Sequence, residues 1–359
     1  MIKITPDLAH RLNNVMSADD VNIAFPDRIA KQKKFVLSIF GDIKASNAEI
    51  DMGIVEKLYQ ASEECVRYYL SGNIVSSVNS LGEILFPPEE DKLYEISLAR
   101  NNKLLNSGEL LGFRIRSTES SSLYKKNEMF HIPFEKRHLV SNQRFSLTGY
   151  PCLYIGSSIY GSWEEVNRPN IDTCNIVSIK NSQLIRMLDL RLPYFEEEKV
   201  VEYDASVLYR SIVAWLCSFR AKEKDASFIV EYVIPQMLTA ALVKSIPEHA
   251  QCAIMDCLYP SGIIYTSSLY NTDVDLFHDA DLFTNYVVPV QNNSQSGLCS
   301  YLCSHFSITD PTSLLIERVK NTDGATFFWT GDAQGTYGTT EFGQLESNLR
   351  SRKYDTLDY

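Results

Sequence analysis

The sequence predicts an α+β protein, in which a helical N-terminal part precedes a mostly β core with inserted helices. Two patterns support this prediction. The first hundred residues repeat apolar side chains at three- and four-residue spacing, which is typical of amphipathic helices. The rest of the chain has short apolar runs between turn residues, which is typical of strands. The length of 359 residues suits two domains better than one.

Helices are expected first. Asp or Asn, which favour helix starts, begin three stretches with helical spacing, at residues 7–16, 27–44 and 47–70. A fourth stretch, at 72–85, stops before two consecutive prolines, which cannot continue a helix. The segment that follows is polar and connects the two parts of the chain. We therefore expect an N-terminal helical domain at residues 1–108.

Strands and helices then alternate, and they predict a second domain at residues 109–290. The expected strands are residues 111–116, 151–158, 175–179, 262–267 and 282–290, and the expected helices are 159–166, 205–219 and 228–244. Residues 291–359 are expected to form an extension that packs on this domain. A helix at 314–319 and a strand at 325–329 are expected within the extension.

The charge balance restricts the class of partner. The chain carries 34 basic and 45 acidic residues, a net charge of −11, which argues against a broad cationic surface for nucleic acid. A local basic site for a small phosphate ligand remains compatible with it. We find neither a secretion signal nor an apolar stretch long enough to cross a membrane. The 8 cysteines are dispersed, so we expect a reduced, cytoplasmic protein.

A zinc site is the alternative use of the cysteines. Cys252 and Cys257 form one pair, and Cys299, Cys303 and His305 follow later in the chain. Two such pairs are able to build a tetrahedral site. The spacing of the first pair is loose, however, and buried free thiols are common. We therefore expect no metal.

Three polar residues stand where a site can form. Arg144 precedes a turn, Tyr154 lies inside an apolar strand, and Glu165 lies in the helix after that strand. The strand and the helix are able to bring Tyr154 and Glu165 to one cleft, with the arginine opposite. The alternative is that Arg144 and Glu165 are surface residues and Tyr154 is an ordinary strand aromatic. His131 and His138 lie in an expected loop, so we interpret them as solvated residues rather than general bases.

The stretch NQRFSLTGYPCLYIGSSIYGSWEEV, at 142–166, resembles the central motif of the RES-domain proteins. That motif has an Arg-aromatic pair, a Gly-x-Pro turn, an apolar strand ending in Tyr, and a helix carrying Glu. The matching residues here are Arg144, Gly149, Pro151, Tyr154 and Glu165. Small family members usually have Gly before the motif arginine and Asn two residues after it, and this chain departs from that pattern at both positions, with Gln143 and Ser146.

Two further segments extend the resemblance over residues 109–290. GFRIRS is similar to the family's opening strand and gives Arg114 and Arg116. GIIYTSS is similar to the late strand that ends in the family's serine. We assign this serine to Ser267, with Ser268 as the near alternative.

The resemblance implies an NAD⁺-consuming enzyme, with a fold similar to diphtheria-toxin-like ADP-ribosyltransferases and NAD⁺ as its substrate. It implies catalytic roles for Arg144, Tyr154 and Glu165. It also implies that NAD⁺ is bound by Arg114, Arg116, Arg144, Tyr154 and Ser267. The residue types suit this chemistry, because arginine pairs well with a pyrophosphate. A tyrosine face can stack on the cationic nicotinamide ring, and a carboxylate stabilises an oxocarbenium-like centre.

The expected function is therefore cleavage of the nicotinamide–ribose bond by an NAD⁺ glycohydrolase or phosphorylase. Such an enzyme would act as a growth-arresting toxin or defence effector. The alternatives are a protein ADP-ribosyltransferase and a catalytically silent NAD-sensing interaction module. In small family members an antitoxin blocks the cleft, so an antitoxin is one expected partner. A homo-oligomer formed through the helical front is another. Gating of the cleft in cis by residues 1–108 or 309–359 is the alternative to an antitoxin.

Overall fold

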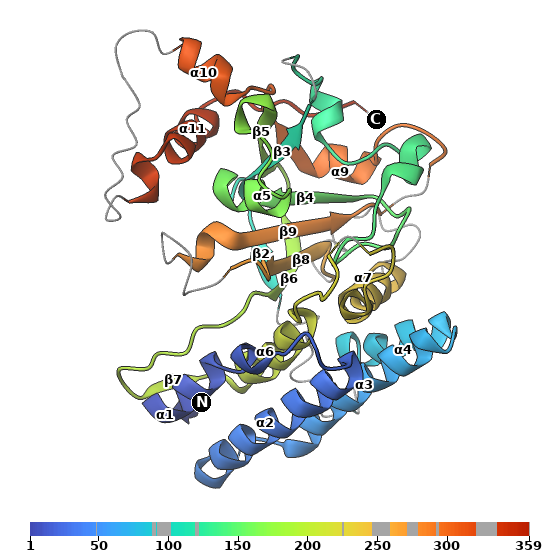
Figure 1. The fold of residues 1–359 in the computed structure, drawn as a ribbon, viewed down its shortest axis with the longest axis vertical. Helices are drawn as coiled ribbons and strands as arrows, with labels where there is room; N and C mark the ends of the chain where they lie inside the picture. The colour runs from blue at the N-terminus through green and yellow to red at the C-terminus, as the bar shows by residue number, and fades with distance from the viewer. Residues whose placement is uncertain are drawn as a thin grey trace.

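The computed structural model describes residues 1–47, 49–87, 91, 102–118, 122–224, 226–245, 259–270, 279–291, 294–320 and 336–358. A layer of helices lies beneath a curled sheet, and further helices cover the sheet from above (Figure 1). The expected α+β class, with a helical N-terminal region, is confirmed. None of the helices in these ranges is long and apolar enough to cross a membrane.

The N-terminal region begins with a short strand, β1 (Ile2–Ile4), and continues with four helices. These are α1 (Pro6–Asn13), α2 (Phe25–Ser46), α3 (Met52–Leu70) and α4 (Ile74–Leu85). Side-chain caps fix three of the starts, because oxygen atoms of Thr5, Asp51 and Asn73 accept hydrogen bonds from the first turns of α1, α3 and α4. The expected helices agree with these to within five residues at each end.

An eight-stranded sheet forms the second part. Its strands are β2 (Lys103–Leu105), β3 (Leu111–Ser117), β4 (Cys152–Gly156), β5 (Cys174–Asn181), β6 (Ile185–Leu190), β8 (Gly262–Thr266), β9 (Thr284–Pro289) and β10 (Phe306–Ile308). Their order is β10-β5-β3-β4-β9-β8-β6-β2. The β6–β8 pair is parallel and the other pairs are antiparallel. The middle of the sheet is therefore built from segments that are far apart in the sequence.

Two long helices, α6 (Ala205–Cys217) and α7 (Val233–Ser245), lie between the sheet and the N-terminal helices (Figure 1). The largest cluster of buried side chains joins Phe40 of α2 and Leu216 of α6 with Ile263 of the sheet. In addition, β1 pairs with β7 (Val201–Tyr203). The apolar core thus continues across residue 108, and burial in this core holds the two parts together.

The C-terminal segment packs on the sheet. Its strand β10 pairs with β5, and α9 (Ser300–His305) precedes it. Helix α10 (Leu314–Lys320) matches the helix expected at 314–319. Helix α11 (Glu341–Arg350) buries Leu345 and Leu349 against α5 (Ile159–Glu165) and the sheet. The strand expected at 325–329 lies outside the described residues.

Candidate functional site

A cavity of about 520 Å³ opens beside the middle of the sheet. The structure places Arg114 of β3, Tyr154 of β4 and Glu165 of α5 around it. Arg144, from the loop before β4, and Ser268, which follows β8, complete one side. Four of the residues expected in a site therefore line a single cavity.

Because successive residues of a strand point to opposite faces of a sheet, Tyr154 lies on the other face from Leu153 and Ile155. Leu153 and Ile155 are buried in a second apolar cluster, on the other face of the sheet, while Tyr154 packs against the cluster around α6 and α7. The Tyr154 hydroxyl donates to Oγ of Ser146 at 3.3 Å. Burial raises the pKa of Tyr154 well above its usual value of 10. The side chain is thus a neutral phenol, and the residue lines the cavity.

Glu165 lies at the end of α5, which is separated from β4 by two residues. Ser158 caps this helix, because its Oγ accepts a hydrogen bond from the Gly161 N–H at 2.8 Å. The Oε1 atom of Glu165 accepts a hydrogen bond from Nδ2 of Asn285, on β9, at 2.7 Å. Its neighbour Glu164 instead pairs with Arg168 at 2.8 Å. Glu165, and not Glu164, lines the cavity.

The start of α5 is held by the C-terminal helix. Glu346 of α11, which is buried, accepts hydrogen bonds from the Ile159 N–H at 2.6 Å and from the hydroxyl of Tyr337. Burial raises the pKa of the Glu346 carboxyl. The helix that carries Glu165 is thus supported at its first turn by a residue of the C-terminal extension.

Arg144 is held entirely by neutral groups. It is 9% exposed, and its Nη1 donates to the carbonyl oxygens of Cys217 at 3.0 Å and Phe219 at 2.9 Å. Its Nη2 donates to Oγ of Ser268 at 2.9 Å, and its guanidinium lies 4.8 Å from the ring centroid of Tyr232. Across the described ranges no carboxylate pairs with Arg144. Its positive charge is therefore fixed in place but not neutralised.

Arg114 is less completely satisfied than Arg144. Its Nη1 donates to the carbonyl oxygen of Tyr154 at 3.1 Å. Its Nε is buried and has no hydrogen-bond partner in the described part of the chain. Burial, followed by the nearby charge of Arg116, lowers the pKa of Arg114 to about 10. A buried N–H without a partner is unfavourable, and it belongs to a residue that lines the cavity.

Two of the expected binding residues lie elsewhere. Arg116 does not line the cavity. It lies one pleat further along β3, where it donates to the carbonyl of Glu128 and stacks over Tyr124 at 4.4 Å. Ser267 is 2% exposed, and its Oγ accepts from the Leu269 N–H at 3.1 Å, so that it stabilises a turn. The alternative, Ser268, is the serine that contacts Arg144.

This chain is similar to a protein of Bacillus subtilis (strain 168) that is named "Putative toxin YopC". The two are 29% identical over 364 residues, and the match covers 95% of this chain and 72% of YopC. The similarity therefore includes both the helical region and the sheet, and it supports a toxin-like family for this chain. Neither a family model nor a solved structure matches this chain.

Several lining or supporting residues were missed by the sequence reasoning. Asn285 is a buried polar residue in a mostly apolar strand, and this contrast could have marked it in the sequence. Gln236 interrupts the apolar helix α7, and its Nε2 donates to Oδ1 of Asn142 at 2.6 Å and to the carbonyl of Gln143 at 2.9 Å. The loop that carries Arg144 is thus anchored to α7. Arg220, which also lines the cavity, gives no local signal.

The expectation that His131 is solvated was wrong. The residue is 1% exposed, and its Nε2 accepts from the Cys299 N–H at 2.8 Å while Nδ1 lies 2.8 Å from the carbonyl of Ile132. This assigns the proton to Nδ1. Burial lowers the pKa of His131 to about 4, so the ring is neutral and structural. His138 is exposed.

In the described part of the chain, no group of three or more His, Cys, Asp or Glu side chains is arranged to hold a metal ion. Cys299 and Cys303 are buried thiols near the third sequence candidate, His305, whose ring stacks on Tyr301. The other two cysteines of the zinc alternative, Cys252 and Cys257, lie outside the described residues.

Proposed function

We propose that this protein is an NAD⁺-consuming toxin that binds NAD⁺ in the cavity and cleaves the bond between nicotinamide and ribose. The observation that carries the proposal is the convergence of Arg114, Arg144, Tyr154 and Glu165 on one cavity of about 520 Å³. This volume is in the range of pockets that hold small molecules and cofactors. The resemblance of residues 109–290 to RES-domain proteins supports the same substrate.

The two arginines suit a diphosphate. A guanidinium has five N–H donors, of which Arg144 uses only part for the Cys217 and Phe219 carbonyls and the Ser268 hydroxyl. Arg114 has an unused Nε donor. Charge-assisted hydrogen bonds from both groups would neutralise the two phosphates, and a planar fork gives better geometry for this than an ammonium group.

Glu165 suits the cleavage step. When the nicotinamide–ribose bond breaks, the bonding electron pair leaves with nicotinamide, and positive charge develops on the ribose. A carboxylate fixed beside the ribose by Asn285 stabilises this charge without moving. Nicotinamide departs as a neutral molecule, so the reaction needs no general acid. Tyr154 is a neutral phenol and supplies a ring face for the nicotinamide.

Nicotinamide release tests the proposal directly. Purified protein is incubated with NAD⁺ in buffer with and without phosphate, and with and without cell extract, and nicotinamide is measured over time. We expect turnover in the parent and a large loss in Glu165→Gln. The product then identifies the acceptor, since water gives ADP-ribose, phosphate gives ADP-ribose 1″-phosphate and a protein side chain gives labelled protein. No turnover under any of these conditions would contradict the enzyme proposal and would favour a silent NAD-sensing module.

The similarity to YopC, which is named a putative toxin, supports the toxin part of the proposal, and we propose that the protein arrests growth from within the cytoplasm. We expect that induced expression stops growth and depletes cellular NAD⁺, and that Glu165→Gln at the same protein level does neither. A neutralising antitoxin that covers the cavity mouth is the expected partner. Growth arrest without NAD⁺ depletion would retain the toxin role but contradict the proposed reaction.

A further inference from the structure

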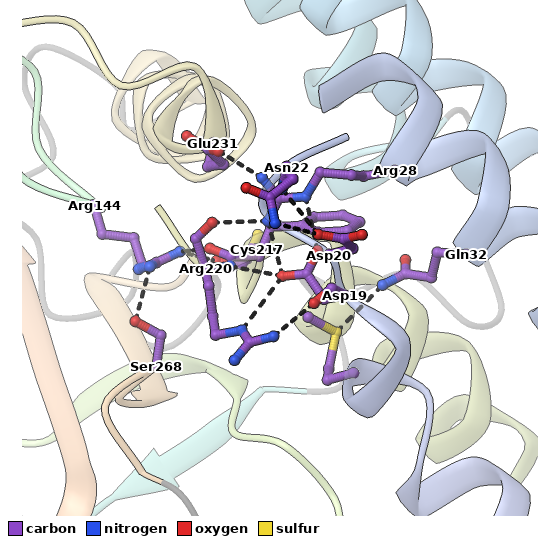
Figure 2. A network of polar contacts seen from close by, with 12 residues as sticks. Asp19, Asp20, Asn22, Arg28, Gln32, Arg144, Cys217, Arg220, Glu231 and Ser268 are labelled. Atoms are coloured by element: carbon purple, nitrogen blue, oxygen red, sulfur yellow. Dashed lines mark hydrogen bonds and ion pairs between the residues drawn. The ribbon is translucent and has the colours of Figure 1, made fainter. Parts of the chain in front are cut away.

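A buried ion network lies next to the cavity and links the N-terminal helices to it (Figure 2). Its centre is Arg28 of α2, which is 3% exposed. Arg28 donates from Nε and Nη2 to the two carboxylate oxygens of Asp19 at 2.7 and 2.8 Å. Its Nη1 donates to Oε1 of Glu231 at 2.6 Å. Three largely buried charges are therefore held in one fixed arrangement.

The network also holds the backbone of Arg220. The Nη2 of Arg28 donates to the Arg220 carbonyl at 2.7 Å, and the Arg220 N–H donates to Oδ2 of Asp19 at 3.0 Å. The Nη2 of the Arg220 side chain donates a hydrogen bond to the Asp19 carbonyl at 2.6 Å. Both backbone polar groups of residue 220 are thus bound by the N-terminal region. The segment 217–220, which begins where α6 ends, is fixed from this side.

The same segment holds Arg144 from its other side. The carbonyls of Cys217 and Phe219 accept both hydrogen bonds from Nη1 of Arg144, and the neighbouring carbonyl, at Arg220, accepts from Arg28. Figure 2 shows Arg144 and Ser268 on one side of this segment and the Asp19 and Arg28 pair on the other. The segment 217–220 therefore contacts Arg28 on one side and Arg144 on the other.

We propose that Arg28, with Asp19 and Glu231, is a positioning residue for Arg144 and thereby sets the affinity of the cavity for a diphosphate-containing ligand. This inference rests on the proposed function. Buried ion pairs often contribute little net stability, because desolvating the charges offsets their attraction. A role in fixing the geometry of Arg144 would explain why these charges are buried, whereas a gain in stability would not. Val21, two residues after Asp19, also lines the cavity.

The substitution Arg28→Lys tests the inference. Lysine keeps the positive charge, but its single ammonium cannot bind both Asp19 oxygens in a planar fork and also reach Glu231 and the Arg220 carbonyl. We measure the Kd for NAD⁺ by calorimetry in a Glu165→Gln background, after circular dichroism and thermal unfolding have shown that the variant is folded. Arg11→Lys is the matched control, because Arg11 pairs with Asp42 at the surface of the same helical region.

We expect Arg28→Lys to weaken NAD⁺ binding about tenfold, as for coupled groups in one network, and Arg11→Lys to leave it unchanged. Combining Arg28→Lys with Arg144→Lys separates positioning from general loosening of the fold. If Arg28 acts through Arg144, the double variant binds little worse than Arg144→Lys alone. A merely structural role gives independent, additive losses and overturns the inference.

Glu231→Gln is the second variant, in case Arg28→Lys does not fold. It keeps the Asp19 pair and an acceptor for Arg28, so we expect a smaller loss of affinity, about threefold, that also disappears in the Arg144→Lys background. Parent affinity in every folded variant contradicts the positioning role and leaves the proposed function intact. A parent protein that binds no NAD⁺ contradicts both.

Discussion

Arg114 donates a hydrogen bond to the backbone carbonyl of Tyr154 at 3.1 Å, so that a side chain of β3 holds β4 at the point where β4 presents its tyrosine. Arg144, across the cavity, is held by two carbonyls and a hydroxyl. In the described ranges neither guanidinium is paired with a carboxylate. The two charges therefore remain available for an anion, and this shared property leads to the first prediction.

Removing either cavity arginine should weaken NAD⁺ binding. We expect Arg114→Ala and Arg144→Ala each to raise the Kd about tenfold to a hundredfold, because each removes charge-assisted hydrogen bonds. Lysine at either position should restore only part of the loss. Calorimetric titration in a Glu165→Gln background measures this without turnover. Arg116→Ala is the control, since Arg116 lies one pleat further along β3 and does not line the cavity, and it should bind like the parent. Parent affinity in both cavity variants would show that the diphosphate does not bind here.

Replacing Glu165 should affect turnover more than binding. Glu165→Gln keeps the shape and the contact with Asn285 but removes the charge that stabilises the ribose centre. We expect nicotinamide release to fall about a hundredfold or more, while calorimetry still detects NAD⁺ binding. The matched control is Glu164→Gln, on the same helix turn but paired with Arg168 instead of lining the cavity. A large loss in Glu164→Gln and none in Glu165→Gln would exchange the roles of the two residues.

Two glycines should respond to alanine in opposite directions. A Cβ at Gly112 of β3 would lie 2.4 Å from the carbonyl oxygen of Gly156, which a packed sheet cannot accommodate without shifting. We expect Gly112→Ala to lower the free energy of unfolding by about 1–3 kcal/mol. A Cβ at Gly41 of α2 meets no atom within 4 Å, so Gly41→Ala should raise it by about 0.5–1 kcal/mol. Urea denaturation compares them, and equal effects would contradict the packing of β3 on β4.

Acid should destabilise the protein in part through His131. The pKa of this residue is lowered from 6.5 to about 4 in the folded state, so the unfolded chain takes up a proton first as the pH falls. The contribution of His131 to the free energy of unfolding is fully present above pH 6.5. It is lost as the pH falls towards 4, and the total loss is about 3 kcal/mol. Denaturant unfolding at several pH values measures this loss. The parent should show a steeper decline than His131→Gln, whereas the exposed His138→Gln should follow the parent. Identical slopes in parent and His131→Gln would contradict the buried, neutral ring.

The sequence predicted those elements whose pattern is local. The N-terminal helices and strands such as β3 and β4 show helical spacing or short apolar runs of their own. The edge strands β2 and β10 have three residues each, too few for a pattern, and β6 is interrupted by Arg186 and Asp189. Strand order depends on pairing between distant segments, and no local pattern encodes it.

The same distinction holds for the cavity. Arg144, Tyr154 and Glu165 fall within one continuous motif, and the structure places all three around the cavity. Arg28 and Arg220 come from other parts of the chain and meet only through packing. The C-terminal end of α6 is a second example. The helix was expected to reach residue 219 but ends at Cys217, and the carbonyls of Cys217 and Phe219, at and just beyond this end, accept hydrogen bonds from Arg144.

The core shared by the N-terminal helices with α6 and α7 delays completion of the cavity during synthesis. The ribosome releases α2–α4 long before the partners that bury their apolar faces, and at about 5–20 residues per second the interval between Leu85 and Ala205 lasts roughly ten seconds. Strand β9, which supplies Asn285, emerges later still. A chain interrupted within this interval has the helices but no cavity. The ribosome must therefore synthesise the chain through β9 before the protein can bind a ligand there, and the proposed activity cannot arise before that point.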